Sequence, residues 1–190
     1  SMDKKERALL RREMGMIFQN AALFDSMSVL ENVMFPLDMF SNDSYKDRVK
    51  RAMFCLDHVN LSDAANKYPG EISGGMQKRV AIARAIALNP KYLFCDEPNS
   101  GLDPKTSLVI DELIHSITKE FNTTTIINTH DMNSVMGIGE HIIFIYQGKN
   151  EWEGTKDDVM SSENELLNNF IFASDLFRKV KEVELEEMRK

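Results

Sequence analysis

Two adjacent carboxylates follow a short apolar run, Tyr92–Cys95, which has the composition of a buried strand. These are Asp96 and Glu97, and Pro98 comes directly after them. Ligands of open parallel sheets bind beyond the carboxyl ends of the strands, so both side chains are expected at a binding edge. One carboxylate can hold Mg²⁺, which prefers few carboxylates with water and phosphate oxygens, and the other can orient an attacking water. A polar loop after a strand explains the pair equally well when the pair is taken alone.

A second chemical signal is the segment Ser73-Gly74-Gly75, which opens an Ala-rich helical pattern that runs from about Gly75 to Leu88. A serine and two glycines at a helix start offer a hydroxyl, exposed backbone N–H groups and the positive end of the helix dipole. Together these groups make a site for an anion such as phosphate. For the three residues alone, an ordinary helix N-cap is the simpler explanation.

Three further polar residues become informative only in combination. Asp103 precedes Pro104, which is the pattern of a cap and a first helical residue. His130 follows a predicted strand, Thr124–Asn128, and Gln19 ends an earlier predicted strand. Each of these residues alone is more simply explained as structural.

The order of the motifs along the chain is more specific than any one of them. From the amino end they are Gln19, Ser73-Gly74-Gly75, Asp96-Glu97, Asp103 and His130. In this order they resemble the ATPase subunits of ABC transporters over nearly the whole chain, and the run from Ile72 to Pro104 is the most specific part. The resemblance implies an α/β fold: a P-loop NTPase-like parallel sheet core, incomplete in this chain, with an α-helical ABC subdomain inserted.

The resemblance also implies a role for each residue. Asp96 would hold Mg²⁺ through water, with Gln19 joining that site to the helical subdomain. Glu97 would act as general base or orient the attacking water, and His130 would contact the γ-phosphate. The residues expected to contact ATP held by the opposite subunit, or to lie at the dimer interface, are Ser73, Gly74, Gly75, Met76 and Asp103. Met76 stands where the family most often has glutamine, which leaves the phosphate-contacting serine and glycines unaffected.

By the same resemblance, the cofactors are ATP and Mg²⁺, and two copies form a head-to-tail homodimer around two ATP molecules. The helical subdomain would dock on an integral membrane permease, at the cytoplasmic face of a bacterial inner membrane. A γ-phosphate that one subunit holds and the other contacts favours the closed dimer, because it binds that state better. Hydrolysis removes the contact and lets the dimer open.

One family motif is missing from the sequence. Members carry Gly-x-x-x-x-Gly-Lys-Ser/Thr well before the loop that carries the glutamine, which is Gln19 in this chain, and no such motif occurs. Without its backbone N–H groups and its lysine, a triphosphate has no cradle. The retained Asp96, Glu97 and His130 indicate a fragment of a longer ATPase rather than a degenerate enzyme. The fragment alone is therefore expected to hydrolyse no ATP.

The elements that must position these residues follow one another in a regular order. Residues 1–19 are interpreted as a remnant of the core that leads to Gln19, and residues 20–88 as the helical subdomain. Residues 89–155 show the strand, helix, strand rhythm of a βαβ core with a parallel sheet. Residues 156–190 are expected to form a charged helical tail, whose predicted apolar contacts are Leu166, Leu167, Phe170, Phe172 and Phe177.

Local signals place the helices more closely. Ser28 and Glu31 form a capping box that opens a helix, which Pro36 is expected to end or kink. A second amphipathic helix is predicted over residues 45–56. Another should run from Pro104 to about Phe121, and its predicted inward face holds Val109, Leu113 and Ile117.

Composition excludes several classes of protein. With 43% hydrophobic and 28% charged residues among 190, the chain has the balance of a soluble globular protein with a core of its own. A net charge of -7 argues against a nucleic-acid binder, which needs clustered basic residues. Apolar stretches such as Ile142–Tyr146 are far shorter than the roughly 20 residues that cross a bilayer. The two cysteines, Cys55 and Cys95, show no metal or redox spacing.

Two stretches, Met16–Val29 and Ile72–Ala85, resemble one branch of the family, the lipid-asymmetry (Mla/Mce-type) ATPases that power phospholipid movement between bacterial membranes. The alternative is an importer for polar amino acids or methionine, whose ATPases share the same core. A soluble ABC protein acting on DNA or ribosomes usually has two cassettes or long coiled-coil inserts, and this chain shows one cassette and no sustained heptads. A non-catalytic interaction module is disfavoured because Asp96, Glu97 and His130 are all present.

Overall fold

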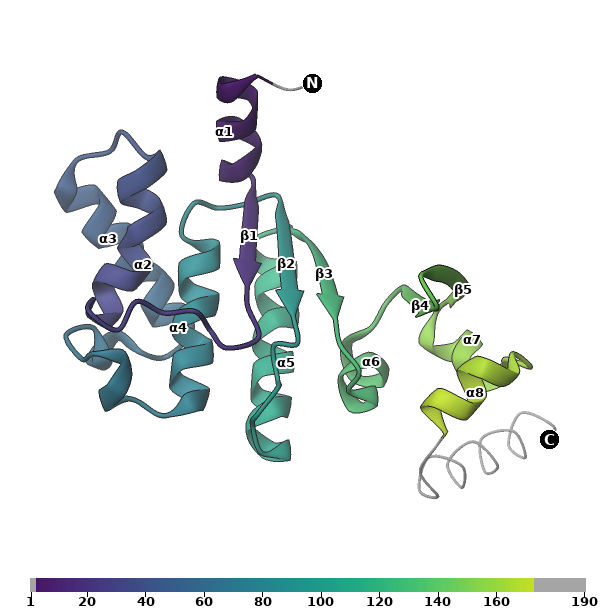
Figure 1. Cartoon of the computed structure of the whole chain (residues 1–190). Coiled ribbons are helices and arrows are strands. Elements are labelled where there is room, and N and C mark those ends of the chain that lie inside the picture. Colours follow the sequence, from purple (N-terminus) through teal and green to yellow (C-terminus); the bar gives the residue numbers. More distant parts are fainter. Residues whose placement is uncertain (1–2, 173–190) are drawn as a thin grey trace. The chain divides into compact units, whose positions relative to one another are not determined.

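The computed structural model describes residues 3–172 of the chain (Figure 1). The chain forms two compact units, with the boundary between Thr129 and His130. No helix among the described residues is long and apolar enough to cross a membrane.

The first unit is built on a three-stranded parallel sheet in the order β1-β2-β3. The strands are β1 (Met14–Ile17), β2 (Tyr92–Asp96) and β3 (Thr124–Asn128). Met14 pairs with Tyr92, and Tyr92 pairs with Thr124, so the three strands begin at one level. Their carboxyl ends therefore meet at one edge of the sheet. The α/β fold class and the parallel sheet that the sequence predicts are confirmed.

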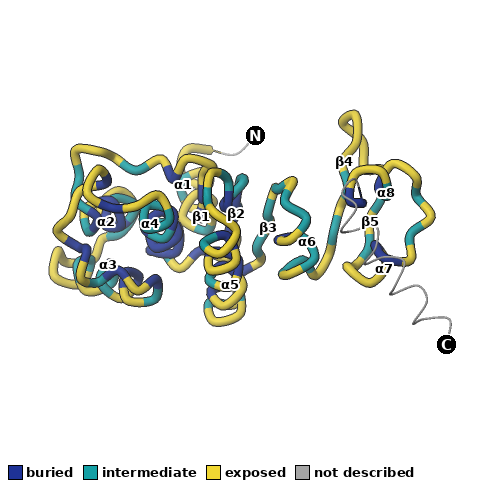
Figure 2. The backbone as a smooth tube through the Cα atoms, turned by 90° about the horizontal axis from the view of Figure 1, so that it is seen from below, coloured by how far each residue is buried: buried dark blue, intermediate teal, exposed yellow. Residues whose placement is uncertain are grey.

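Helices cover one face of this sheet and extend away from its β1 edge (Figure 1). They are α1 (Lys4–Arg12), α2 (Val29–Phe40), α3 (Tyr45–His58), α4 (Gly74–Ile86) and α5 (Pro104–Glu120), with short 3₁₀ turns at Ser62–Ala64 and Pro69–Glu71. α4 packs against β1, α5, α2 and α3. It is the most buried helix, as the dark segments of Figure 2 show. α1 was not predicted, although Asp3 and Glu6 form a capping box at its start.

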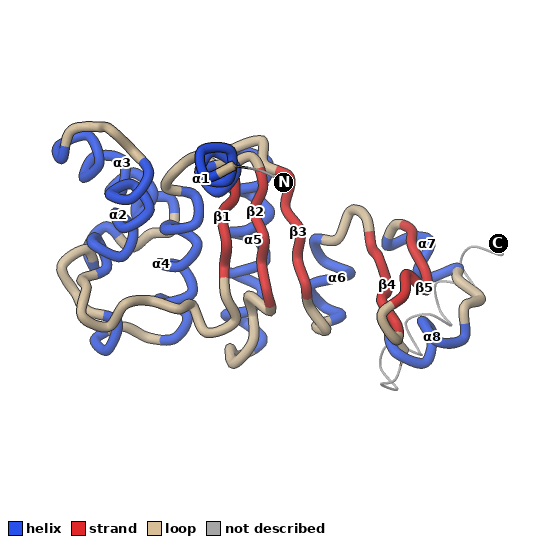
Figure 3. The backbone as a smooth tube through the Cα atoms, turned by 45° about the horizontal axis from the view of Figure 1, so that its top comes forward, coloured by secondary structure: helices blue, strands red, loops and turns tan. Residues whose placement is uncertain are grey.

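The two faces of the sheet differ in their burial. Gly15, Ile17, Leu93 and Cys95 point to the helix side and are buried. Strand residues alternate between faces, so their neighbours point the other way. On that second face lie Met14, Met16, Tyr92 and Ile126, which are 41%, 39%, 40% and 52% exposed. Parallel sheets ordinarily have both faces covered. In the described part of this unit, no helix covers the second face (Figure 3).

Helix α2 begins as predicted and continues through Pro36, where the sequence predicts an end or a kink. The Ser28 hydroxyl accepts the Glu31 N–H at 3.2 Å, and the Glu31 carboxylate accepts the Ser28 N–H at 2.7 Å. Pro36 does not end the helix, which continues to Phe40. An interior proline costs a helix about 3 kcal/mol. Burial of the Val33, Met34 and Leu37 side chains around it offsets that cost.

Helix α5 confirms part of its predicted inward face. Ile117 is buried and Leu113 packs against the core as predicted, whereas Val109 is 48% exposed and Ile110 and Ile114 are buried instead. Both sets have helical spacing, so periodicity alone could not choose between them. The choice is set by contact with the sheet and α4. It also buries Asp111, whose carboxylate accepts the Asn99 side-chain amide at 2.7 Å.

The second unit joins short helices to a hairpin. Its elements are α6 (Met132–Ile138), β4 (Ile142–Tyr146), β5 (Lys149–Gly154), α7 (Lys156–Ser161) and α8 (Glu165–Ile171), and β4 pairs with β5 antiparallel. Of the predicted tail contacts, Leu167 and Phe172 are buried and Phe170 packs its ring 5.4 Å from that of Phe144. Leu166 is exposed, which corrects its prediction, and Phe177 lies outside the described residues.

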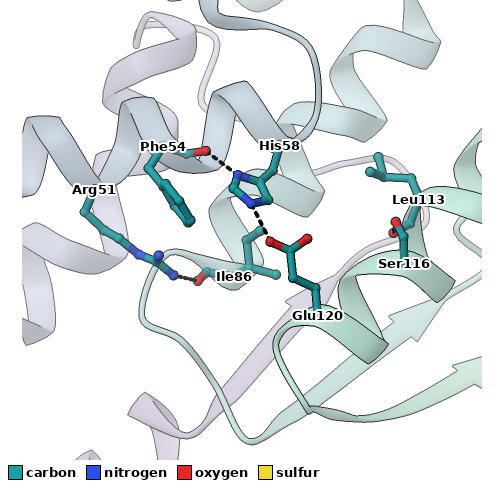
Figure 4. Close-up of polar contacts among 7 residues, drawn as sticks. All are labelled: Arg51, Phe54, His58, Ile86, Leu113, Ser116 and Glu120. Carbon is teal, nitrogen blue, oxygen red and sulfur yellow. Dashed lines mark hydrogen bonds and ion pairs between the residues drawn. The ribbon is translucent and has the colours of Figure 1, made fainter.

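Polar contacts fasten α3 to α4 and α5 (Figure 4). The Arg51 guanidinium donates to the carbonyls of Ile86 at 2.8 Å and Ala87 at 2.9 Å, where α4 ends. The His58 ring contacts the Phe54 carbonyl through Nδ1 and the Glu120 carboxylate through Nε2, both at 2.8 Å. Both ring nitrogens thus face acceptors, which favours the imidazolium form. Burial lowers the pKa of His58, and the hydrogen bonds to Phe54 and Glu120 outweigh it and raise the pKa above its ordinary value.

We expect Gly15→Ala to lower the free energy of unfolding by about 1–3 kcal/mol, the usual cost of overpacking a core. A Cβ at Gly15 would lie 2.5 Å from the backbone oxygen of Ala85, so β1 and α4 would have to separate. Urea unfolding measures the change. Gly70→Ala is the control, because a Cβ there meets no atom within 4 Å. Equal stability of the two variants would contradict the close approach.

Glu120→Gln should destabilise the chain by about 0.5 kcal/mol at low pH, the size of a largely exposed ion pair. Because the pKa of His58 is raised in the folded state, the pair contributes fully below the ordinary histidine pKa and is lost as pH rises through the raised value. Urea unfolding at pH 5.5 and pH 9 should therefore show a difference at the lower pH alone. Glu112→Gln, exposed on the same helix, should show none at either pH.

Candidate active site

The acidic pair, Asp96 and Glu97, lies at the carboxyl end of β2, as the sequence predicts. The Asn128 side-chain amide, from the end of β3, donates to Asp96 Oδ1 at 2.8 Å and holds that carboxylate in place. The Glu97 N–H donates to the Asn128 carbonyl at 2.8 Å. Glu97 adopts φ of 46°, in the left-handed region that few non-glycine residues occupy. Such outliers concentrate at functional sites, where the surroundings hold them.

Gln19 reaches the same edge from β1. Its Nε2 donates to the Ser100 hydroxyl, three residues after Glu97, at 3.2 Å. Gln19 begins the loop of residues 19–28, which we name the glutamine loop. Within it, Ala21 and Ala22 have φ of 60° and 48°. Arg84 of α4 donates to the carbonyls of both alanines at 2.7 Å, which fixes this unusual backbone.

A buried amide holds the second half of the glutamine loop. The Asn32 side chain is fully buried at the start of α2. Its oxygen accepts the Phe24 N–H at 2.8 Å, and its Nδ2 lies 3.0–3.1 Å from the carbonyls of Phe24, Met27 and Ser28. One side chain therefore satisfies backbone groups that the turn of the chain would leave without partners.

Lys78 of α4 joins the glutamine loop to the acidic pair. Its side chain is only 5% exposed, and its Nζ donates to the carbonyls of Gln19 and Glu97, the latter at 3.5 Å. Burial lowers the pKa of Lys78, and the Glu97 charge partly opposes this. The motifs in the sequence did not single out Lys78. A signal was available, because Lys78 stands one and two turns before Ile82 and Ile86 on the buried face of an Ala-rich helix.

The segment Ser73-Gly74-Gly75 begins α4 at the surface. Ser73 is the N-cap and accepts the Met76 N–H at 3.3 Å, and Ser73 and Gly74 are exposed. A Cβ on Gly75 would lie 2.8 Å from the Thr106 methyl group, so the starts of α4 and α5 are in contact. Met76 packs against the core.

Asp103 caps α5 beside that contact. Its carboxylate accepts the N–H groups of Lys105 and Thr106 at 3.1 Å and the Thr106 hydroxyl at 2.5 Å. These hydrogen bonds, those of Thr106 first, lower the pKa of Asp103. Ser73 and Asp103 thus cap two helix starts that lie in contact, and both residues are exposed.

His130 opens the second unit, two residues after the end of β3. Its predicted convergence with Asp96 and Glu97 therefore stays a prediction. The other predicted site residues all belong to the first unit. There, Gln19, Asp96 and Glu97 are joined at one sheet edge through Ser100, Asn128 and Lys78.

A family model described as ABC transporter matches residues 1–100, more than half of the chain. The chain belongs to the ABC transporter family. The start of α4 and the carboxyl end of β2, described above, lie inside the matched residues.

Several proteins and structures are similar to this ABC transporter chain. The methionine import ATP-binding protein MetN of Photobacterium profundum is 41% identical over 90% of the chain and 49% of its own length. MetN of Campylobacter jejuni is 38% identical, with 90% and 55% covered. The dimeric ATP-binding cassette MJ0796, bound to ADP and Pi, shares 38% identity and a TM-score of 0.72, with 82% of this chain and 68% of that chain covered. The chain spans about half the length of the curated relatives it matches.

Asn32→Leu should lower the free energy of unfolding by about 3 kcal/mol, since it leaves buried backbone groups of the glutamine loop without partners. Urea unfolding gives the change. Asn42→Leu, at an exposed position between α2 and α3, serves as the control and should change stability little. A loss equal to that of the control would show that the Asn32 contacts contribute nothing.

Proposed function

We propose that the chain is part of the ATP-binding subunit of an ABC importer for methionine or a similar small polar solute. The geometry that carries the ATPase role is the joining of Asp96, Glu97 and Gln19 at one edge of a parallel sheet. The importer role is supported by the relatives, which are named for methionine import and are 38–42% identical over 83–90% of the chain.

The acidic edge fits Mg²⁺ and a nucleotide triphosphate. Mg²⁺ is held in such sites by one or two carboxylates, water and phosphate oxygens. Asp96, fixed by Asn128, would be the carboxylate on the magnesium side, and Gln19, which contacts Ser100, would serve the same edge. Bound Mg²⁺ would neutralise charge on the phosphate oxygens.

Glu97 would orient the attacking water and accept its proton. Its backbone is held on both sides, by Asn128 at the N–H and by Lys78 at the carbonyl. A fixed backbone limits where the carboxylate can reach, which is what positioning a water requires. His130 would contact the γ-phosphate from the segment that follows β3.

A second copy of the chain would complete the site. Ser73, Gly74 and Gly75 expose the N-terminal end of α4, which suits the γ-phosphate of ATP held by a facing subunit. Asp103 lies on the same surface and would contact that subunit. The similar cassette MJ0796 is described as dimeric and bound to ADP and Pi, which supports this arrangement.

The phosphate cradle is proposed to come from a part of the protein beyond these 190 residues. The sheet face that carries Met14, Met16 and Ile126 is apolar and exposed in the described unit. A parallel sheet needs cover on this face, and a strand and helix flanking a phosphate loop would supply both cover and cradle. In the whole protein, the predicted helical subdomain at residues 20–88 would dock on a membrane permease at the cytoplasmic face of the inner membrane.

The relatives favour the importer over the phospholipid branch that the sequence suggested. The two stretches behind that suggestion, Met16–Val29 and Ile72–Ala85, form the glutamine loop and α4. Both serve the nucleotide site rather than the cargo, so both branches can share them. Cargo would instead be recognised by the permease, and a permease that co-purifies with the whole protein can be tested with methionine and with phospholipid.

We expect the 190-residue chain to hydrolyse no ATP, and the longer protein that contains it to be an ATPase. In the longer protein, Glu97→Gln should lower kcat by about 100-fold or more, the usual share of a positioned general base. Glu112→Gln, exposed on α5, should leave kcat unchanged. Phosphate release measures both. Turnover by the 190-residue chain that disappears in Glu97→Gln would overturn the need for a cradle outside it.

A further inference from the structure

One helix, α4, binds the backbone of the glutamine loop through two cationic side chains. Lys78 donates to the Gln19 carbonyl, and Arg84 donates to those of Ala21 and Ala22. A third cation of the same helix, Arg79, points elsewhere and donates to the Val59 carbonyl at 3.1 Å. The helix that begins with Ser73-Gly74-Gly75 is thus tied directly to the loop that carries Gln19.

Lys78 differs from Arg84 because it also contacts the acidic pair. Its Nζ lies 3.5 Å from the Glu97 carbonyl and within hydrogen-bonding distance of the Gln19 carbonyl. One buried ammonium group therefore links the end of β1 to the end of β2. The two carbonyls belong to the two residues whose side chains the proposed reaction uses.

Stability alone does not account for a cation at this position. Taking an ammonium group out of water costs several kcal/mol, and carbonyl contacts recover only part of that. The surrounding residues of α4, among them Ile82 and Ile86, are apolar and buried. An unbranched apolar side chain of similar length would fill the same space without the desolvation cost.

We propose that Lys78 is a positioning residue that holds Gln19 and Glu97 in a fixed relation at the carboxyl edge of the sheet. This proposal rests on the proposed ATPase function. With its carbonyl held, Gln19 can keep its side chain on Ser100. Glu97, whose φ of 46° is unfavourable for a glutamate, is held at its N–H by Asn128 and at its carbonyl by Lys78.

The same contact connects the start of α4, which would face the second subunit, with the acidic edge of the sheet. Lys78 lies near the start of α4, close behind the segment that would meet a facing subunit's nucleotide. A displacement of that end of α4 moves Nζ, and Nζ holds the Gln19 and Glu97 backbones. Lys78 therefore transmits the state of the dimer interface to the water-orienting group of its own subunit.

Amide hydrogen exchange of the 190-residue chain tests the contact without any nucleotide. In Lys78→Met, exchange at residues 18–23 and 97–101 should rise about tenfold, the effect of losing one charge-assisted hydrogen bond. The thermal midpoint should change little, because removal of a buried charge offsets the loss of a donor to two carbonyls. Lys78→Gln, which keeps an uncharged N–H donor group, should give a smaller rise. Arg79→Met is the control and should leave exchange at both segments unchanged.

Unchanged exchange in Lys78→Met, or an equal rise in Arg79→Met, would overturn the proposal.

A second experiment measures the kinetics of the longer ATPase. There, Lys78→Met should lower kcat about tenfold with the KM for ATP unchanged, and Lys78→Gln should restore part of the loss. An equal fall of kcat in Arg79→Met, or a kcat unaffected by Lys78→Met, would also overturn it. If the unaltered longer protein hydrolyses no ATP, the proposed function fails, while the exchange result still decides whether Lys78 holds the two segments.

Discussion

The close packing of α4 against β1 is the constraint on which the rest of the first unit depends. Gly15 lets the strand approach the end of α4 so closely that a Cβ would meet the Ala85 oxygen at 2.5 Å. This contact brings the buried face of α4 against the sheet, the core helix α5 and the helices α2 and α3. Interiors at crystal-like density transmit displacement rather than absorb it. A movement of α4 must therefore displace the sheet together with α2 and α3.

The polar contacts of α4 tie it to the glutamine loop. Its buried face carries Lys78 and Arg84 among apolar neighbours, and both cations end on backbone carbonyls of the glutamine loop. Its exposed start presents Ser73 and Gly74. One helix thus connects a surface suited to an anion with the acidic edge of the sheet. Under the proposed function, this arrangement links the nucleotide held by the facing subunit to the residues that would act on the nucleotide held by this subunit.

The second face of the sheet, unlike the face packed against the helices, is exposed. Met14, Met16 and Ile126 lie on a surface that parallel sheets ordinarily bury. The chain spans about half of its curated relatives, and the proposed phosphate cradle belongs to elements that would cover this face. On the proposed function, the same elements would complete both the nucleotide site and the cover of this sheet face.

The sequence by itself determined the strands and main helices of the first unit other than α1, the order of the motifs and the family. Strand runs, the Ser28–Glu31 capping box and the proline at the start of α5 are local signals, and local physics decides them. It did not determine that Ile110 and Ile114 rather than Val109 turn inward on α5, that α2 continues past Pro36, or that Lys78 is buried. Those outcomes depend on packing between segments far apart in the chain. Only the tertiary structure brings Lys78, Gln19 and Glu97 together, because a hydrogen bond to a distant carbonyl leaves no periodic trace in the sequence.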